Sequence, residues 1–213
     1  MNVIPVFNCP DVACVQKKIA VAKLFLLDAD IVHLDVADGS FTEHKTWNDP
    51  LAWVKLKSPF ALEVHLMVEH PEEHADNWLA AGAQRLIVHV ESITQESLHE
   101  IVSAAKKYNV QVMLSSKPET PNEELLPYLK EFTEFQVLAV SPGASGQTFL
   151  PFMEEKIRFL REEVPNAIIE VDGGMNDVTS KLVRSFGADT IVSSSYIFGA
   201  QDPKAAYESL KNS

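Results

Sequence analysis

"IVHLDVADGS", residues 31–40, is an apolar run typical of a buried strand, yet it carries His33 and Asp35 and ends on Gly39 and Ser40. Because the side chains of a strand alternate between its two faces, His33 and Asp35 share one face. A His–Asp pair that satisfies its own hydrogen bonds explains this strand as well as a functional site does. The other strands must therefore decide between the two interpretations.

Two further strand-like runs add polar residues of the same kind. "LEVHLMV", residues 62–68, places His65 and Met67 on one face. "IIEVDGGMN", residues 168–176, ends an apolar strand on Asp172, before two glycines that permit a sharp turn. Two imidazoles and two carboxylates suit one divalent cation of zinc, iron, manganese or cobalt, with coordination positions left for substrate oxygens. The predicted metal ligands are His33, Asp35, His65 and Asp172.

Short apolar runs alternate with longer helical patterns along the whole chain. This alternation predicts parallel strands joined by crossover helices, in an open doubly wound sheet or a closed (β/α)8 barrel. We favour the TIM-barrel arrangement, as a single domain over residues 1–213, because eight units fit its compact form and polar residues gather at the strands' C-terminal ends. The predicted strands are 3–7, 30–35, 61–67, 85–90, 110–115, 135–140, 167–171 and 189–193, and the predicted helices are 11–27, 49–56, 72–82, 95–108, 121–131, 150–163, 176–186 and 203–211.

Composition limits the partners. The formal net charge of -12 opposes non-specific binding to nucleic acid and to acidic membrane surfaces. Cys9 and Cys14 are the only cysteines, too few for a disulfide framework and spaced unlike a zinc signature, so a reducing compartment is the simplest setting. No signal peptide or membrane-spanning stretch is recognisable. We expect a soluble, cytoplasmic protein that binds neither nucleic acid nor membrane.

The loops that follow the last three predicted strands carry features of a phosphate site. "SPGASGQ", residues 141–147, is glycine-rich but lacks the lysine of a nucleotide P-loop, which indicates a cradle of backbone N–H groups. "VSSSYIF", residues 192–198, supplies hydroxyl groups, and barrel enzymes often hold phosphate in this region. The predicted phosphate-binding residues are Gly143, Ala144, Ser145, Gly146, Gly173, Gly174, Ser194 and Ser195.

Six motifs in order resemble the ribulose-phosphate 3-epimerase family over nearly the whole chain: "HLDVADG", "VHLMVEHPEEH", "AGAQRLIVHVES", "SPGASGQTF", "IEVDGG" and "GADTIVSSSYIF". The resemblance implies a (β/α)8 barrel, a divalent metal, no organic cofactor, and interconversion of D-ribulose 5-phosphate with D-xylulose 5-phosphate in the pentose phosphate pathway. It also implies that Asp35 and Asp172 are the proton acceptor and donor on opposite faces of a planar enediolate, whose charge the cation stabilises. We expect a small phosphorylated sugar as substrate and a homo-oligomer.

Several positions depart from the family pattern. The substrate-contacting serine after the first strand is Asn8, whose amide still donates and accepts hydrogen bonds but is larger. Of the sulfur-rich lining near the reacting carbons, Met67 clearly remains, and we expect Asn8, His65 and Met67 to contact substrate. Replacing a glycine that needs positive φ would strain the backbone. The other departures are Ala37 and Leu138 for methionines, Ala144 and Ser145 in the "PGFGGQ" loop, and Ser194 in the "GS" pair.

These departures leave a related ketose phosphate, such as allulose 6-phosphate, as an alternative substrate. A decarboxylase of the related barrels would need Asp-x-Lys after a strand, and a Schiff-base aldolase would need a lysine in "FQVLAVSPG"; neither is present. A non-catalytic phosphosugar-binding barrel is the rival from another class, and the presence of all four ligands favours an isomerase. We expect His89 and Glu91 to hydrogen-bond the site from outside it, and Met113 and Met153 to pack in the core.

Overall fold

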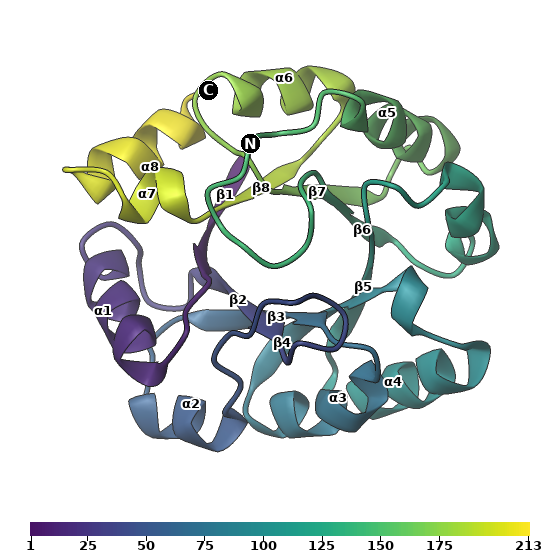
Figure 1. The fold of residues 1–213 in the computed structure, drawn as a ribbon, viewed down its shortest axis with the longest axis horizontal. Coiled ribbons are helices and arrows are strands. Elements are labelled where there is room, and N and C mark those ends of the chain that lie inside the picture. Colours follow the sequence, from purple (N-terminus) through teal and green to yellow (C-terminus); the bar gives the residue numbers. More distant parts are fainter. The chain divides into compact units, whose positions relative to one another are not determined.

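The computed structural model describes residues 1–213, and its eight parallel strands follow the order β1 to β8 in a closed barrel (Figure 1). The predicted fold class is confirmed, and every predicted strand is present with ends that differ by up to two residues. The strands are β1 (Asn2–Phe7), β2 (Ile31–Ala37), β3 (Ala61–Met67), β4 (Ala83–His89), β5 (Gln111–Ser116), β6 (Glu134–Leu138), β7 (Ile168–Asp172) and β8 (Thr190–Ser193).

The helices follow the expected alternation with several differences. The helix predicted over 11–27 ends at Ala22, the helices predicted from 150 and 176 begin three residues later, and the short 3-10 helix at Val90–Ser92 was not predicted. The segment predicted as a helix over 121–131 is a 3-10 helix, within which Pro127 lacks the N–H that a regular helix needs. The four-residue helix α7 was not predicted. The helices are α1 (Val12–Ala22), α2 (Pro50–Leu56), α3 (Pro71–Ala80), α4 (Gln95–Tyr108), α5 (Met153–Glu163), α6 (Thr179–Phe186), α7 (Ser195–Phe198) and α8 (Pro203–Lys211), with 3-10 helices η1 (Val90–Ser92) and η2 (Asn122–Tyr128).

The chain divides into two compact units, and the first comprises Val6–Val112. Side chains next to the first turns of α2 and α4 cap the N-termini of these helices. The Asp49 side chain caps α2 by accepting from Ala52 N at 2.9 Å, and Thr94 and Ser97 form a reciprocal capping box on α4. Helix α3 packs against β3, β4 and α4 and buries Trp78 completely. The apolar faces of the strands are thereby covered, and their other faces are left for polar side chains.

The second unit comprises Met1–Pro5 and Met113–Ser213. Strand β7 pairs with β6 and β8, and β8 also pairs with the Asn2–Pro5 part of β1. Helix α5 packs against β6, β7 and α6 and buries Ile157 and Leu160. None of the helices in the structure combines the length and apolar character that a membrane span requires.

Gly174 and Gly82 both adopt positive φ, +71° and +95°, but they differ in their surroundings. A Cβ atom on Gly174 would lie 2.3 Å from the backbone nitrogen of Phe149, whereas a Cβ on Gly82 would meet no atom within 4 Å. Gly174 is therefore required by both conformation and space, and Gly82 by conformation alone.

We predict that Gly82→Ala lowers the free energy of unfolding by about 1–2 kcal/mol, the cost of a left-handed alanine. Gly174→Ala should cost more, because the Phe149 backbone must also move. Urea denaturation of both variants measures the difference. Equal losses of stability would contradict the close approach at Gly174.

Candidate active site

The parallel register of β2 and β3 brings the predicted ligands of these two strands together. It pairs Asp35 with His65 and His33 with Glu63. All four side chains are buried, with His33, Glu63 and His65 at 0% exposure and Asp35 at 6%. The expectation that His33 and Asp35 share one strand face with His65 is confirmed.

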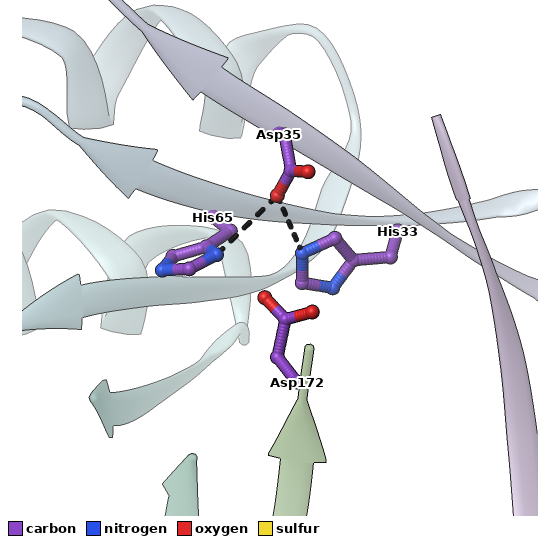
Figure 2. Close-up of side chains that lie close together, drawn as sticks. All are labelled: His33, Asp35, His65 and Asp172. Carbon is purple, nitrogen blue, oxygen red and sulfur yellow. Dashed lines mark hydrogen bonds and ion pairs between the residues drawn. The ribbon is translucent and has the colours of Figure 1, made fainter. Parts of the chain in front are cut away.

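Asp35 contacts both histidines of this cluster, and both dashed lines in Figure 2 end on its carboxylate. Its Oδ1 atom lies 3.1 Å from His33 Nε2 and 3.4 Å from His65 Nδ1. Its Oδ2 atom accepts a hydrogen bond of 2.8 Å from the Asn8 side-chain amide. Burial would raise the pKa of Asp35, but hydrogen bonds with His33 and His65 outweigh it and lower that pKa strongly. Asp35 is therefore a buried carboxylate in its charged form.

His33 is held between two carboxylates. Its Nδ1 atom lies 2.8 Å from Glu63 Oε1, and Glu63 Oε2 accepts a 2.6 Å hydrogen bond from Arg85 Nη1. Burial alone would lower the pKa of His33, but hydrogen bonds with Asp35 and Glu63 raise it well above its ordinary value. Burial would raise the pKa of Glu63, whereas His33 and Arg85 lower it. A cation bound at His33 Nε2 would replace the proton there.

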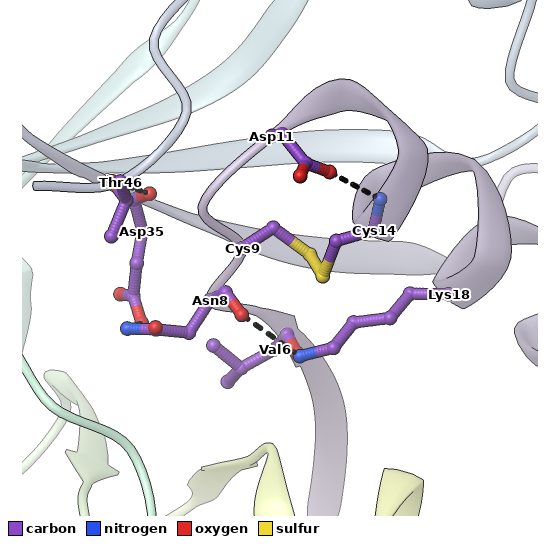
Figure 3. Close-up of a disulfide and its surroundings, with 8 residues drawn as sticks. All are labelled: Val6, Asn8, Cys9, Asp11, Cys14, Lys18, Asp35 and Thr46. Carbon is purple, nitrogen blue, oxygen red and sulfur yellow. Dashed lines mark hydrogen bonds between the residues drawn. A yellow bond between two sulfur atoms is a disulfide. The ribbon is translucent and has the colours of Figure 1, made fainter.

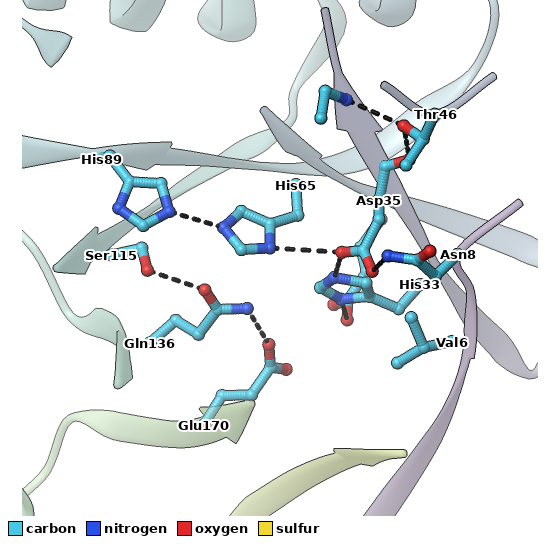
Figure 4. A network of polar contacts seen from close by, with 12 residues as sticks. Val6, Asn8, His33, Asp35, Thr46, His65, His89, Ser115, Gln136 and Glu170 are labelled. Atoms are coloured by element: carbon cyan, nitrogen blue, oxygen red, sulfur yellow. Dashed lines mark hydrogen bonds and ion pairs between the residues drawn. The ribbon is translucent and has the colours of Figure 1, made fainter. Parts of the chain in front are cut away.

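His65 leads outward to His89 and Glu91. His65 Nε2 lies 2.8 Å from His89 Nε2, and His89 Nδ1 lies 3.1 Å from Glu91 Oε2 (Figure 4). An ionised carboxylate only accepts hydrogen bonds, so we infer that neutral His89 carries its proton on Nδ1 and that His65 donates from Nε2. With His65 protonated on Nε2, a second proton on Nδ1 or a bound metal ion makes the 3.4 Å approach of this nitrogen to Asp35 Oδ1 attractive. The expected hydrogen bonding of His89 and Glu91 next to His65 is present.

Lys18 lies under the loop that carries Asn8. Its ammonium donates to the carbonyl oxygens of Val6, at 3.0 Å, and of Asn8, at 3.2 Å. Burial lowers the pKa of Lys18 to about 8, although the charge of Asp35 opposes the shift. Neither Lys18 nor Arg85 was predicted: Lys18 belongs to a run with no motif, and Arg85 lies in the motif "AGAQRLIVHVES" but was given no role there.

Asp172, the fourth predicted ligand, ends β7 in the second unit and is partly buried. Its backbone carbonyl accepts from Ala139 N at 2.6 Å. Gly173 and Gly174 follow it with φ of +105° and +71°, and a Cβ on Gly173 would lie 2.4 Å from the Val140 side chain. The turn that ends this strand therefore requires both glycines.

The same unit contains a buried polar chain that the sequence analysis missed (Figure 4). The Ser115 hydroxyl donates to Gln136 Oε1 at 2.7 Å, and Gln136 Nε2 donates to Glu170 Oε1 at 3.1 Å. A signal was available, because Gln136 and Glu170 are single polar residues inside the apolar runs "FQV" and "IIEV". Their partners depend on strand pairing and could not be deduced from either run.

The predicted phosphate loops meet in the second unit. Gly143 and Gly146 have φ of +117° and +84°, and a Cβ on Gly146 would lie 3.8 Å from Ser195 Cβ. Gln147 Nε2 donates to the carbonyl oxygens of Ser141, at 2.6 Å, and Ala144, at 2.8 Å, which closes the first loop. The loops at 141–147 and 194–195 are therefore neighbours.

The strain considered for lost glycines does not arise in these loops. Non-glycine residues with positive φ occur only at Ala29, Lys57 and Asn109, so Ala144, Ser145 and Ser194 occupy ordinary backbone conformations. Among the remaining residues of interest, Met67, Met113 and Met153 are buried, as are the replaced positions Ala37 and Leu138.

The sequence profile of the ribulose-phosphate 3 epimerase family matches residues 9–198. The cytoplasmic isoform of ribulose-phosphate 3-epimerase from Oryza sativa subsp. japonica is 34% identical over 195 residues, covering 90% of this chain and 85% of that protein. The ribulose-phosphate 3-epimerase of Chlamydia pneumoniae is 37% identical and covers 84% and 80%. That of Schizosaccharomyces pombe is 32% identical and covers 100% and 93%.

Solved structures agree on the fold. The crystal structure of a 3-hexulose-6-phosphate synthase superposes with a TM-score of 0.68 at 18% identity, covering 100% of this chain and 99% of that one. The KGPDC structure from Streptococcus mutans gives 0.72 at 15% identity, covering 99% and 95%. At such identities these structures support the barrel alone, whereas the profile and the sequence relatives show that the chain belongs to the ribulose-phosphate 3-epimerase family.

Proposed function

We propose that this chain is an isomerase that inverts the carbon next to the ketone of a phosphorylated ketose, converting D-ribulose 5-phosphate to D-xylulose 5-phosphate. The observation that carries the proposal is the buried cluster of His33, Asp35 and His65, in a chain of this family. Buried charged groups are costly, so such a cluster indicates chemistry more than stability.

One divalent cation is part of the proposal, with His33, Asp35, His65 and Asp172 as its ligands (Figure 2). The donor set fits zinc, iron, manganese or cobalt, since imidazole nitrogens and carboxylate oxygens ligate all four. The facing atoms His65 Nδ1 and Asp35 Oδ1, 3.4 Å apart, also support a cation between them. When bound, the cation would stabilise the negative charge that develops on substrate oxygens as the carbon loses its proton.

The protein's own groups would move the protons. Asp35 would accept the proton from one face of the substrate, and Asp172 would deliver one to the other face. Asn8, His65 and Met67 would contact the sugar, while the loops at 141–147, 173–174 and 194–195 would hold its phosphate through backbone N–H and hydroxyl groups. We further propose one barrel domain, a homo-oligomer and a cytoplasmic location.

A turnover assay tests the proposal directly. With divalent metal added, the purified protein should convert D-ribulose 5-phosphate to D-xylulose 5-phosphate. The assay should include allulose 6-phosphate as a second substrate. Ala37 pairs with Met67 in the strand register, and its side chain is smaller than the methionine of the family pattern, which leaves more space for a larger sugar. No turnover of either sugar by metal-loaded protein would indicate a phosphosugar-binding barrel without catalysis.

Metal binding is tested by His65→Ala, which should weaken metal affinity by about tenfold or more and lower activity with it. His70→Ala is the matched control, because the His70 side chain is 67% exposed on another part of the unit, and it should retain both properties. Elemental analysis and chelator competition measure occupancy. The ligand assignment is wrong if purified protein contains no metal and added zinc, iron, manganese or cobalt neither binds nor restores activity.

The two-base assignment is tested by hydrogen exchange in heavy water. Asp172→Asn should be nearly inactive as an epimerase but should still exchange the reactive hydrogen of one epimer, and Asp35→Asn should exchange that of the other. Metal occupancy must be measured alongside, since both residues are proposed ligands. Equal exchange from both epimers in a metal-loaded variant would mean that one base serves both faces.

A further inference from the structure

Cys9 and Cys14 form a disulfide that the sequence analysis did not predict (Figure 3). The bond spans the turn between the end of β1 and the start of α1. The Cα atoms of Cys9 and Cys14 lie 5.6 Å apart. Cys9 is buried at 1% exposure, whereas Cys14 is partly exposed. The disulfide therefore closes a short turn and joins one buried residue to one partly exposed residue.

The disulfide adjoins the residue that contacts Asp35. Asn8 immediately precedes Cys9, and its carbonyl accepts from Lys18. The carbonyl of Cys9 accepts from Trp47 N at 2.7 Å. The main chain on both sides of the Asn8 side chain is thus tied down, by hydrogen bonds and by the disulfide.

Asn8 in turn orients the Asp35 carboxylate. Its amide donates to Oδ2 at 2.8 Å, while Oδ1 faces His33 and His65. The Asp35 backbone is held separately, because its carbonyl accepts from the Thr46 hydroxyl at 2.7 Å. A donor on Oδ2 therefore restricts rotation of the carboxylate group itself.

We propose that Asn8 is a positioning residue for Asp35 and that the Cys9–Cys14 disulfide keeps it in place, so that reducing this disulfide lowers catalytic efficiency through Asn8. The inference rests on the proposed function, in which Asp35 is a base and a metal ligand. Asn8 stands where the resemblance to the family implies a serine, and its longer side chain is the one that reaches Asp35 Oδ2. A disulfide in a protein of a reducing compartment is usually a redox-responsive one.

The opening reaction is ordinary thiol–disulfide exchange with a dithiol. One thiolate attacks the sulfur of the partly exposed Cys14, and the Cys9 sulfur leaves as a thiolate and takes up a proton. The second thiol of the reductant then displaces Cys14 and closes its own ring. The protein gains two electrons and two protons, and the dithiol becomes a cyclic disulfide. The turn is then free to sample more conformations.

The experiment compares oxidised and dithiol-treated protein, with free thiols counted in each. Reduction should lower kcat/KM and metal affinity by about tenfold, the scale of one hydrogen bond to a charged group. The NMR signals of the Asn8 side-chain amide should shift toward those of a solvent-exposed amide. The Cys9→Ser/Cys14→Ser double variant should have the kcat/KM and metal affinity of the reduced protein, and treatment with the dithiol should change neither value.

The Asn8→Ala variant distinguishes an effect of reduction that acts through Asn8 from a general loss of stability. It should lower kcat/KM and metal affinity as reduction does, and reduction should then have no further effect. Asn166→Ala, the same change on an exposed turn, should leave both values and the dithiol response unchanged. An equal dithiol effect in Asn8→Ala, or no effect in the wild type, would overturn the proposal.

The two proposals fail in distinguishable ways. If no ketose phosphate is turned over in either redox state, the proposed function fails, while the metal affinity and the Asn8 amide signals still test the positioning role. Two free thiols in protein treated with oxidant would overturn the disulfide itself, whatever the activity.

Discussion

The register between β2 and β3 is the constraint on which the site depends. Seven residue pairs run from Ile31 with Ala61 to Ala37 with Met67. A slip of one residue would turn the polar side chains of one strand toward the helices and its apolar side chains inward. Burial of apolar residues on the helix-covered faces therefore fixes the register, and the register places Asp35 beside His65.

The charges in the cluster are tolerated because they alternate in sign. Arg85 contacts Glu63, Glu63 contacts His33, and His33 contacts Asp35. Each buried ion thus has an opposite charge as a neighbour, which offsets much of the cost of removing it from water. Removing a single member would take an opposite charge away from each of its neighbours, so the energetic contributions of the four residues are coupled.

The sequence was sufficient for what depends on periodicity. Alternating apolar runs predicted the eight strands, and the spacing of His33 and Asp35 predicted their shared face. Both predictions depend only on local periodicity, such as the two-residue repeat of side-chain direction in a strand. Which residues meet across strands could not be deduced in the same way. The Glu63–Arg85 pair requires the β3–β4 register, and the Gln136–Glu170 pair requires the β6–β7 register. Predicting the Cys9–Cys14 disulfide would have required the path of the turn between β1 and α1. Predicting that the replaced glycines cause no strain would have required the backbone angles at those positions.

His65, His89 and Glu91 form a row of hydrogen-bonded side chains that runs from the buried cluster toward solvent. His89 is fully buried, but the Glu91 side chain is 19% exposed. An imidazole that receives a proton on one nitrogen can release one from the other, so this row has the groups that a proton relay between His65 and Glu91 requires. The hydrogen bonds of this row therefore link a fully buried imidazole to a side chain that solvent reaches, with no water molecule needed between them.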